Sequence, residues 1–162
     1  MLTIEKKSLN VGKFVSTEHV DSVIRNYKQE RWIQNSERLG KEDSLSGWWS
    51  IEEVEKFLEV AKMHGADGIK LYFGAYAKDY TEKPEYAGLQ TLVMVGTKQK
   101  EGAYGTTINK DIYVNGENGN TILAYNAMNL CPPFCGKKGL ADDSEEIGVS
   151  IIDRGDAGMV VI

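Results

Sequence analysis

The two cysteines, Cys131 and Cys135, are the first residues to test for chemistry, because they lie close together around a pair of prolines. A redox pair usually has two residues between its cysteines at the start of a helix, and here there are three, two of them proline. A zinc site needs four ligands, and only His19 and His64 could complete one. Two free thiols are therefore the expected outcome. The alternative is a disulfide across the loop, which would favour an oxidising compartment.

The segment after the cysteines carries two further candidate motifs. Gly136-Lys137-Lys138-Gly139 lacks the glycine spacing and the following Ser or Thr of a phosphate-binding loop, which favours a surface turn. The acidic patch that follows lacks the alternating oxygen ligands and the glycine of a calcium loop, so no metal or cofactor is expected. It is interpreted as a solvated loop that could face a basic partner, and it consists of Asp142, Asp143, Glu145 and Glu146.

Nucleophilic or acid–base catalysis has no clear set of residues in this chain. A catalytic triad needs a nucleophile, a base and an orienting group, and the chain has only two histidines. His19 is expected near the start of a surface helix and His64 at the end of another, where each has a structural explanation. No spacing singles out a pair of carboxylates or tyrosines. Enzymatic activity is left open but is not favoured.

Aromatic side chains and one lysine are the candidate contacts to a ligand or partner. Two adjacent indoles cannot point the same way, so one is expected to pack against Val54 as a hydrophobic staple while the other covers a surface groove. The remaining candidates lie on or after a predicted strand, on the side opposite its apolar residues. The alternative is that all of them serve packing alone. The full set is Trp48, Trp49, Lys70, Tyr72 and Tyr76.

Two helices are predicted in the first half of the chain. Apolar residues at helical spacing predict the first over Ser16–Gln34, followed by a polar loop over Asn35–Gly47. The second is predicted over Ile51–His64, because Ser50 and Glu53 have the spacing of a capping box. Gly65 can then take the left-handed conformation that ends a helix.

The second half of the chain has the alternating pattern of strands. Strands are predicted over Gly68–Tyr76 and Leu89–Thr97, with Ile69, Leu71 and Phe73 facing a core beneath the second helix. Shorter strands are expected at 111–114 and 121–125, joined by an Asn/Gly turn, and in two runs near the C-terminus. The prediction is an α+β fold in which two N-terminal helices pack on one face of a mostly antiparallel sheet of four to six strands, with residues 1–162 forming a single domain.

Length and charge limit the kinds of partner. The chain has 162 residues and a net charge of −5, so it suits one soluble acidic domain that repels both nucleic acid and anionic membranes. No stretch is apolar enough to cross a bilayer, and the first residues of the chain as given do not form a secretory signal. A cytoplasmic location is therefore expected.

One ordered block of the sequence supports a resemblance. It runs from Trp48-Trp49-Ser50-Ile51-Glu52-Glu53 through Gly68-Ile69-Lys70-Leu71-Tyr72 to Thr91-Leu92-Val93-Met94-Val95. Over about residues 46–135 it resembles a set of small uncharacterised proteins of the Bacteroidetes type. That set has no assigned activity, so the resemblance implies no catalytic residue, and the pair Cys131 and Cys135 is not part of its pattern.

Three functions follow as hypotheses. The leading one is a non-catalytic acidic interaction domain, an inhibitor-like or immunity-like partner of a basic protein, because acidic charge and long loops occur without a catalytic signature. The second is a small-molecule-binding or enzymatic pocket lined by Trp48, Trp49, Tyr72 and Tyr76. The third is a structural subunit that forms a homo-oligomer through exposed strand edges.

Overall fold

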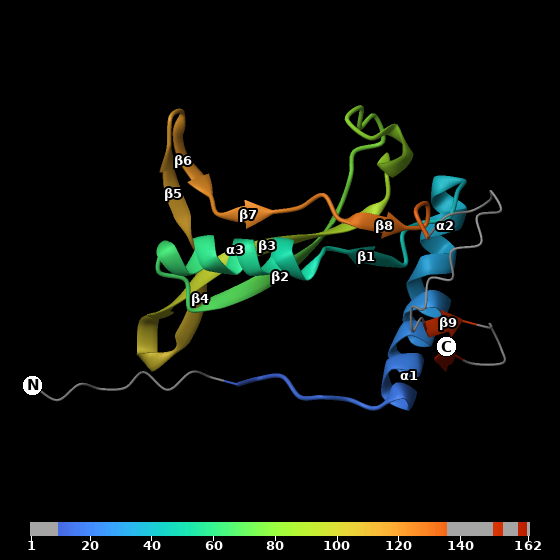
Figure 1. The fold of residues 1–162 in the computed structure, drawn as a ribbon, viewed down its shortest axis with the longest axis horizontal. Helices are drawn as coiled ribbons and strands as arrows, with labels where there is room; N and C mark the ends of the chain where they lie inside the picture. Colours follow the sequence, from blue (N-terminus) through green and yellow to red (C-terminus); the bar gives the residue numbers. More distant parts are fainter. Residues whose placement is uncertain (1–9, 136–150, 154–158, 162) are drawn as a thin grey trace, which may run out of the picture. The chain divides into compact units, whose positions relative to one another are not determined.

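The computed structural model describes residues 10–135, 151–153 and 159–161 (Figure 1). Its fold is α+β with antiparallel strands. Two compact units are distinguished, one built around Asn10–Glu42 and the other comprising Asp43–Phe134, and each is described by itself. The Gly136–Gly139 motif and the acidic patch at 142–146 lie outside the described residues. None of the helices in the described ranges has the length and apolar character needed to cross a bilayer.

The first unit contains a continuous helix that is longer than predicted. It consists of α1 (Thr17–Tyr27), the π-helical turn η1 (Lys28–Trp32) and α2 (Ile33–Leu39). Ser16 caps its start by accepting a hydrogen bond from the amide of His19 at 3.3 Å. The predicted loop from Asn35 was wrong in its first residues, because neither glycine nor proline interrupts the helix before Gly40. Gly40 ends it with φ of 71°.

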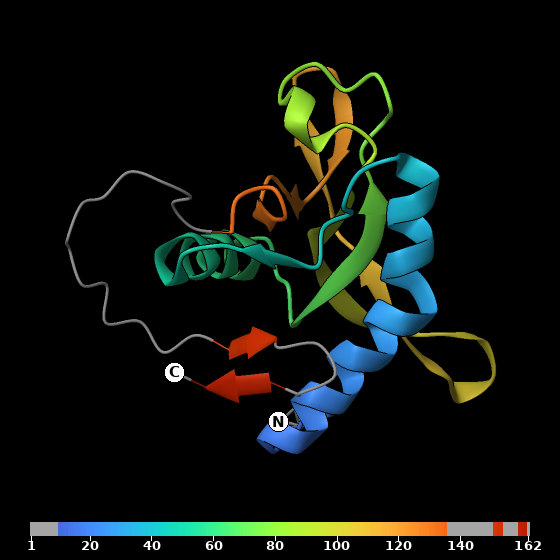
Figure 2. The same ribbon diagram turned by 90° about the vertical axis from the view of Figure 1, so that its right-hand side faces the viewer.

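The same unit contains two short strands near the C-terminus. β9 (Ile151–Asp153) pairs antiparallel with β10 (Met159–Val161), and Figure 2 shows them as the two red arrows. Strands therefore form within both of the C-terminal runs that were predicted to be β-prone.

In the second unit, α3 (Ile51–Met63) has the capping box predicted from its sequence. The Ser50 hydroxyl accepts from the Glu53 amide at 3.1 Å, and the Glu53 carboxylate accepts from the Ser50 amide at 3.0 Å. Gly65 follows the helix with φ of 82°. The local signals at both ends of this helix are confirmed.

A central long strand organises the main sheet. β3 (Gln90–Glu101) pairs along its first eight residues with β2 (Gly68–Ala75) and along its last five with β4 (Thr107–Asp111). β7 (Ala124–Tyr125) pairs with the middle of β3. All these pairs are antiparallel, as predicted.

The other strands do not join this sheet, so the expected single sheet was wrong. β1 (Ser46–Trp48) pairs with β8 (Asn129–Cys131), which places a strand in part of the predicted loop. Within the described residues, β5 (Tyr113–Gly116) and β6 (Gly119–Ile122) pair with each other and with no other strand. Most residues of this hairpin are exposed, so it contributes little to the buried core.

The core beneath α3 lies over β3 and β7. Phe57 and Ala61 are the buried residues of the helix, and the Phe57 ring lies 5.8 Å from that of Tyr125. A Cβ built on Gly96 would be 3.5 Å from the Cβ of Ala61, so the helix packs closely on the sheet at this glycine. The helix was predicted to cover the apolar side of Ile69–Phe73, and this is only partly correct, because Phe73 is 83% exposed.

A second packed cluster surrounds Tyr86, in the short helical turn η2 (Pro84–Tyr86). Tyr86 is fully buried, and its hydroxyl donates to the Met128 carbonyl at 3.0 Å and accepts from the Leu130 amide at 3.2 Å. Met128, Leu130 and Leu89 are buried as well. This cluster fixes β8 and the loop that precedes β3.

The expected free thiols are replaced by a disulfide. Both Cys131 and Cys135 are disulfide-bonded, and the chain has no other cysteine. The amide of Phe134 donates to the Leu130 carbonyl at 2.8 Å, which closes the turn between the two cysteines. The turn that contains the two prolines thus brings Cys131 and Cys135 together.

We predict that Gly96→Val lowers the free energy of unfolding by about 1–3 kcal/mol, because a side chain there would push against Ala61 and Leu123. Gly74→Val is the matched control in the neighbouring strand β2, where an added Cβ would meet the Thr91 methyl at an ordinary 3.7 Å. Its expected effect is within about 0.5 kcal/mol. Urea denaturation measures both. Equal effects at the two glycines would contradict the proposed close packing of α3 on β3.

Candidate functional site

An apolar row on β2 is the most unusual surface of the second unit. Ile69, Leu71 and Phe73 alternate along the strand, and we call them the β2 apolar row. Their exposed fractions are 38%, 49% and 83%. They pair with Gly96, Met94 and Leu92 of β3 and therefore lie on the same face of the sheet as α3. Large apolar side chains exposed in a row are typical of interaction sites.

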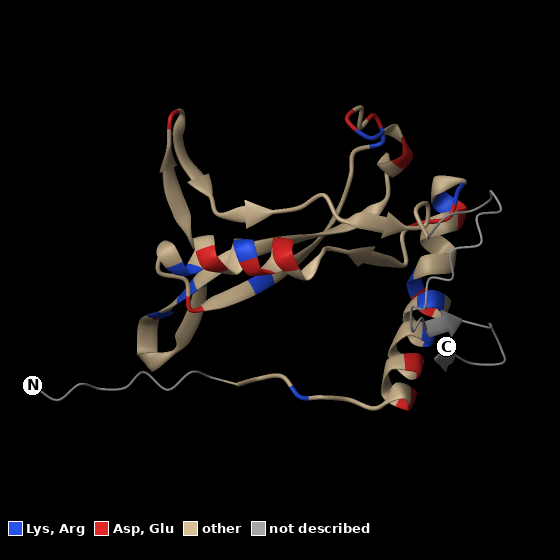
Figure 3. Cartoon of the chain, in the orientation of Figure 1, with Lys and Arg blue, Asp and Glu red and all other residues tan. Residues whose placement is uncertain are grey.

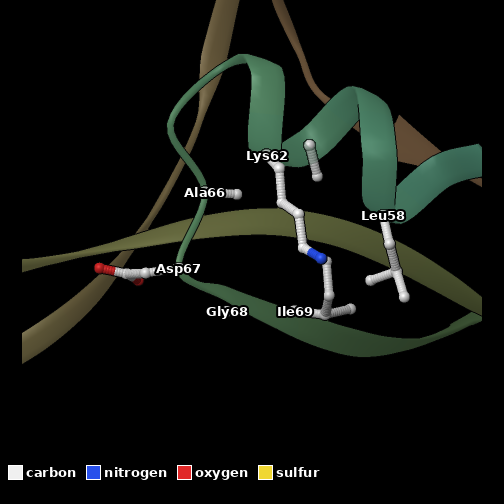
Figure 4. Close-up of a pocket in the computed structure, with 7 residues that line it drawn as sticks. Leu58, Lys62, Ala66, Asp67, Gly68 and Ile69 are labelled. Carbon is white, nitrogen blue, oxygen red and sulfur yellow. The ribbon is translucent and has the colours of Figure 1, made fainter. Parts of the chain in front are cut away.

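A shallow pocket lies at one end of this row, between the second half of α3 and the start of β2. Its volume is about 260 Å³. Figure 4 shows Lys62 extending from the helix toward Ile69, with Leu58 beside it and Asp67 directed away. The pocket is smaller than the usual range of about 300–1,000 Å³ for small-molecule sites, so it suits one side chain of a partner. It is lined by Leu58, Ala61, Lys62, Ala66, Asp67, Gly68 and Ile69.

Carboxylates occupy the outward side of α3. Glu52, Glu55 and Glu59 are exposed and lie opposite the buried Phe57 and Ala61, on a face that also carries the exposed Lys56. We call the three carboxylates the acidic side of α3. Figure 3 shows this helix with mainly acidic bands, whereas β2 carries a single basic position. An apolar row on the sheet and a set of carboxylates on the exposed side of the helix together match a partner that combines apolar and basic residues.

The opposite face of β2 carries an ionic network. The Lys70 ammonium lies 2.6 Å from an Asp111 carboxylate oxygen and donates to the Asn109 carbonyl at 3.1 Å and to the Tyr72 hydroxyl at 3.2 Å. The Tyr72 hydroxyl donates to the other Asp111 oxygen at 2.6 Å. We call Lys70, Tyr72 and Asp111 the Lys70 clasp. It joins β2 to β4 across β3.

The protonation of the clasp favours a structural role. Hydrogen bonds from Lys70 and Tyr72 lower the pKa of Asp111, and the hydrogen bond to Asp111 raises the pKa of Lys70. A lysine that acts as a nucleophile or base needs a lowered pKa. All three donors of this ammonium also have acceptors. These contacts hold the Lys70 ammonium in place and favour its charged form.

The structure separates the five predicted contact residues. Lys70 and Tyr72 meet in the clasp. Trp49 and Tyr76 both form hydrogen bonds to Asn126. The Trp49 indole donates to its main-chain carbonyl at 3.4 Å, and the Tyr76 hydroxyl donates to its side-chain oxygen at 2.8 Å. Trp48 lies apart from both, in β1, and is 60% exposed. None of the five lines the pocket at α3.

Sequence analysis missed the residues that hold these groups together. Asp111, Asn126 and Tyr125 lie far along the chain from their partners, and no local spacing signals them. The Tyr125 hydroxyl bonds Glu53 at 3.0 Å, which contributes to a lowered pKa of that carboxyl after the bonds from Ser50. Such contacts depend on strand pairing, which the local sequence pattern does not contain.

No metal centre is found in the part of the chain that the structure describes. Within those residues, no group of three or more His, Cys, Asp or Glu side chains could hold a metal ion. His19 lies in the first turn of α1 and His64 caps α3, as the sequence predicted.

We predict that Asp111→Asn changes how stability depends on pH. A carboxyl whose pKa is lowered by folding stabilises the fold above its unfolded pKa of about 3.9, and that stability is lost as the pH falls through the folded pKa. The variant should be less stable than the wild type at pH 7, and the difference should shrink below about pH 4. Thermal unfolding from pH 2 to 7 measures this. Tyr72→Phe removes one of the two bonds and should give a smaller change, and a constant difference across the range would contradict the role of the clasp.

Comparison with known proteins assigns no role to these residues. No family model matches the chain, and no curated protein and no solved structure is significantly similar to it. The function of the surface is therefore inferred from its own geometry and charge.

Proposed function

We propose that the chain is a non-catalytic interaction domain that binds a basic protein through the β2 apolar row and the acidic side of α3. The observation that carries this proposal is Phe73, an aromatic side chain 83% exposed in a regular strand and aligned with Leu71 and Ile69. Binding residues of this kind typically provide most of the affinity of an interface.

The apolar contribution extends from the strand to the helix. Ile51, in the first turn of α3, is 76% exposed, and Leu58 and Ile69 both line the pocket. The ribbon in Figure 1 shows β2 running back from the end of α3 toward the start of that helix. Phe73 belongs to the second half of this strand. A partner covering this side would bury apolar side chains from both elements, which is the main favourable term in association.

The charge contribution comes from the acidic side of α3. Glu52, Glu55 and Glu59 add to a net charge of −5 for the whole chain. Such a surface speeds the approach of a basic partner and repels acidic ones, and its effect weakens with salt.

The two alternatives from the sequence receive less support. The indoles and tyrosines proposed to line one pocket belong to different groups of contacts, because Trp48 lies in β1 and Tyr72 belongs to the clasp. A homo-oligomer formed through strand edges stays a proposal, and a second copy would occupy the same surface of β2 as the basic partner.

The disulfide supports a second proposal, on location. A bond between Cys131 and Cys135 persists in an oxidising compartment and is rare in the cytoplasm, which was the location expected from sequence. Acid quenching of host cells followed by maleimide labelling should leave both cysteines unlabelled until a reductant is added. Labelling without reductant would contradict an oxidised state in the cell.

We predict that Phe73→Asp weakens partner binding about 30-fold or more, as expected when a central aromatic contact is lost. The partner is first identified by replacing Phe73 with benzoylphenylalanine, cross-linking in host cells and purifying the linked protein. Its dissociation constant for the wild-type chain is then measured by calorimetry. Tyr104→Asp is the matched control, because Tyr104 is fully exposed in the turn η3 (Ala103–Gly105), away from this surface. It should change binding less than about twofold.

A separate variant tests the contribution of charge to partner binding. Replacing Glu52, Glu55 and Glu59 together by glutamine should slow association and flatten its dependence on salt. The proposed function would be overturned if the Phe73→Asp variant bound the partner as tightly as the wild-type chain. It would also be overturned if binding of the partner to the wild-type chain did not depend on salt.

A further inference from the structure

The outer edge of β2 presents unpaired main-chain groups. β2 is the terminal strand in the order β2-β3-β4, and within the described residues no strand pairs with its other side. The amide of Tyr76 donates to the Leu89 carbonyl at 3.0 Å, and hydrogen-bonded residues alternate along an antiparallel pair. Lys70, Tyr72 and Gly74 therefore face β3, whereas the amides and carbonyls of the β2 apolar row point outward.

This edge lacks the features that usually prevent pairing with another chain. Natural edge strands carry proline, a bulge or outward charges. β2 contains no proline, pairs with β3 over eight consecutive residues without a bulge, and has Lys70 as its single charged residue. That ammonium is neutralised by Asp111.

The strand at the other end of the order provides a contrast. β4 carries Lys110 directly opposite Lys98 of β3, and Lys100 lies two residues further on. Like charges at these positions repel an added strand of a basic protein. Of the two end strands in the order β2-β3-β4, β2 lacks this repulsion.

We infer that β2 binds an extended segment of the basic partner as an additional antiparallel strand. This inference rests on the proposed function and states how the partner is held. In such a mode, main-chain hydrogen bonds supply affinity and alternate side chains supply specificity.

The surroundings of the edge define the chemistry of the segment. Residues opposite Leu71 and Phe73 would place their side chains on the face of α3, beside the β2 apolar row, so they should be apolar. The intervening side chains would lie on the other face, beside Tyr72, which is 42% exposed. The Lys70 ammonium already lies 5.2 Å from the centroid of the Tyr72 ring, and Asp111 neutralises that ammonium. A segment that alternates apolar residues with lysine or arginine places its apolar side chains against the β2 apolar row and its basic side chains on the opposite face, beside the neutralised clasp. The net charge of −5 and the acidic side of α3 attract such a segment over a distance.

The test uses a synthetic nine-residue peptide that alternates valine and lysine, with two matched analogues. In the paired register, the valine amides point toward β2 and the lysine amides point away. N-methylation of the valines removes those donors and should weaken binding about tenfold or more. N-methylation of the lysines leaves composition and charge the same and should change binding less than about threefold.

Hydrogen exchange by NMR reports on the chain itself. The amides of Ile69, Leu71 and Phe73 should exchange quickly in the free protein and slow about tenfold or more on saturation with the parent peptide. The amides of Lys70, Tyr72 and Gly74 should be protected in both states, which is the internal control.

Each of the remaining outcomes contradicts the inference, and each points to a different explanation. Equal binding by all three peptides, or outward amides that stay unprotected, would mean docking through side chains alone, and the proposed function would survive. No binding by any peptide overturns strand addition by an apolar and basic segment, while the Phe73→Asp result judges the proposed function separately. Self-association of the free chain that protects the same amides would assign the edge to a second copy.

Discussion

The approach of α3 to the sheet at Ala61 and Gly96 determines which surfaces of the second unit are covered. Two small residues allow close contact, and the helix is centred on β3 and β7, where Phe57 packs on Tyr125. A helix with its side chains is about 10–12 Å wide, and neighbouring strands are about 4.8 Å apart, so one helix covers about two strands. β2 lies on the other side of β3, where Leu58 and Lys62 of the helix line a pocket together with Ile69. The exposed Phe73 follows from this arrangement.

The elements that local chemistry specifies could be predicted from sequence. The capping box at Ser50 and Glu53, the glycine that ends α3 and the alternation along β2 all depend on residues a few positions apart. The end of the first helix was misplaced for a similar reason. A polar stretch such as 35–39 is compatible with either a loop or an exposed helix, and only Gly40 settles where the helix stops.

What could not be predicted depends on pairing between distant segments. An alternating pattern identifies the apolar side of β2, but it does not say whether another element covers that side. The partners of Lys70 and Tyr76, which are Asp111 and Asn126, lie 41 and 50 residues away. Their positions follow from how β4 and β7 pair with β3. The sequence therefore identifies individual candidate residues, but it does not show that they belong to separate groups of contacts.

The Lys70 clasp has a consequence for the thermodynamics of recognition. An edge strand held by only one neighbour tends to fray, and a partner would then have to order it as it binds. Here an ion pair and a phenol link β2 to the strand beyond its neighbour, and these links oppose fraying of the edge in the free protein. If a segment adds to β2 as proposed, the entropy lost on association would come mainly from that incoming segment.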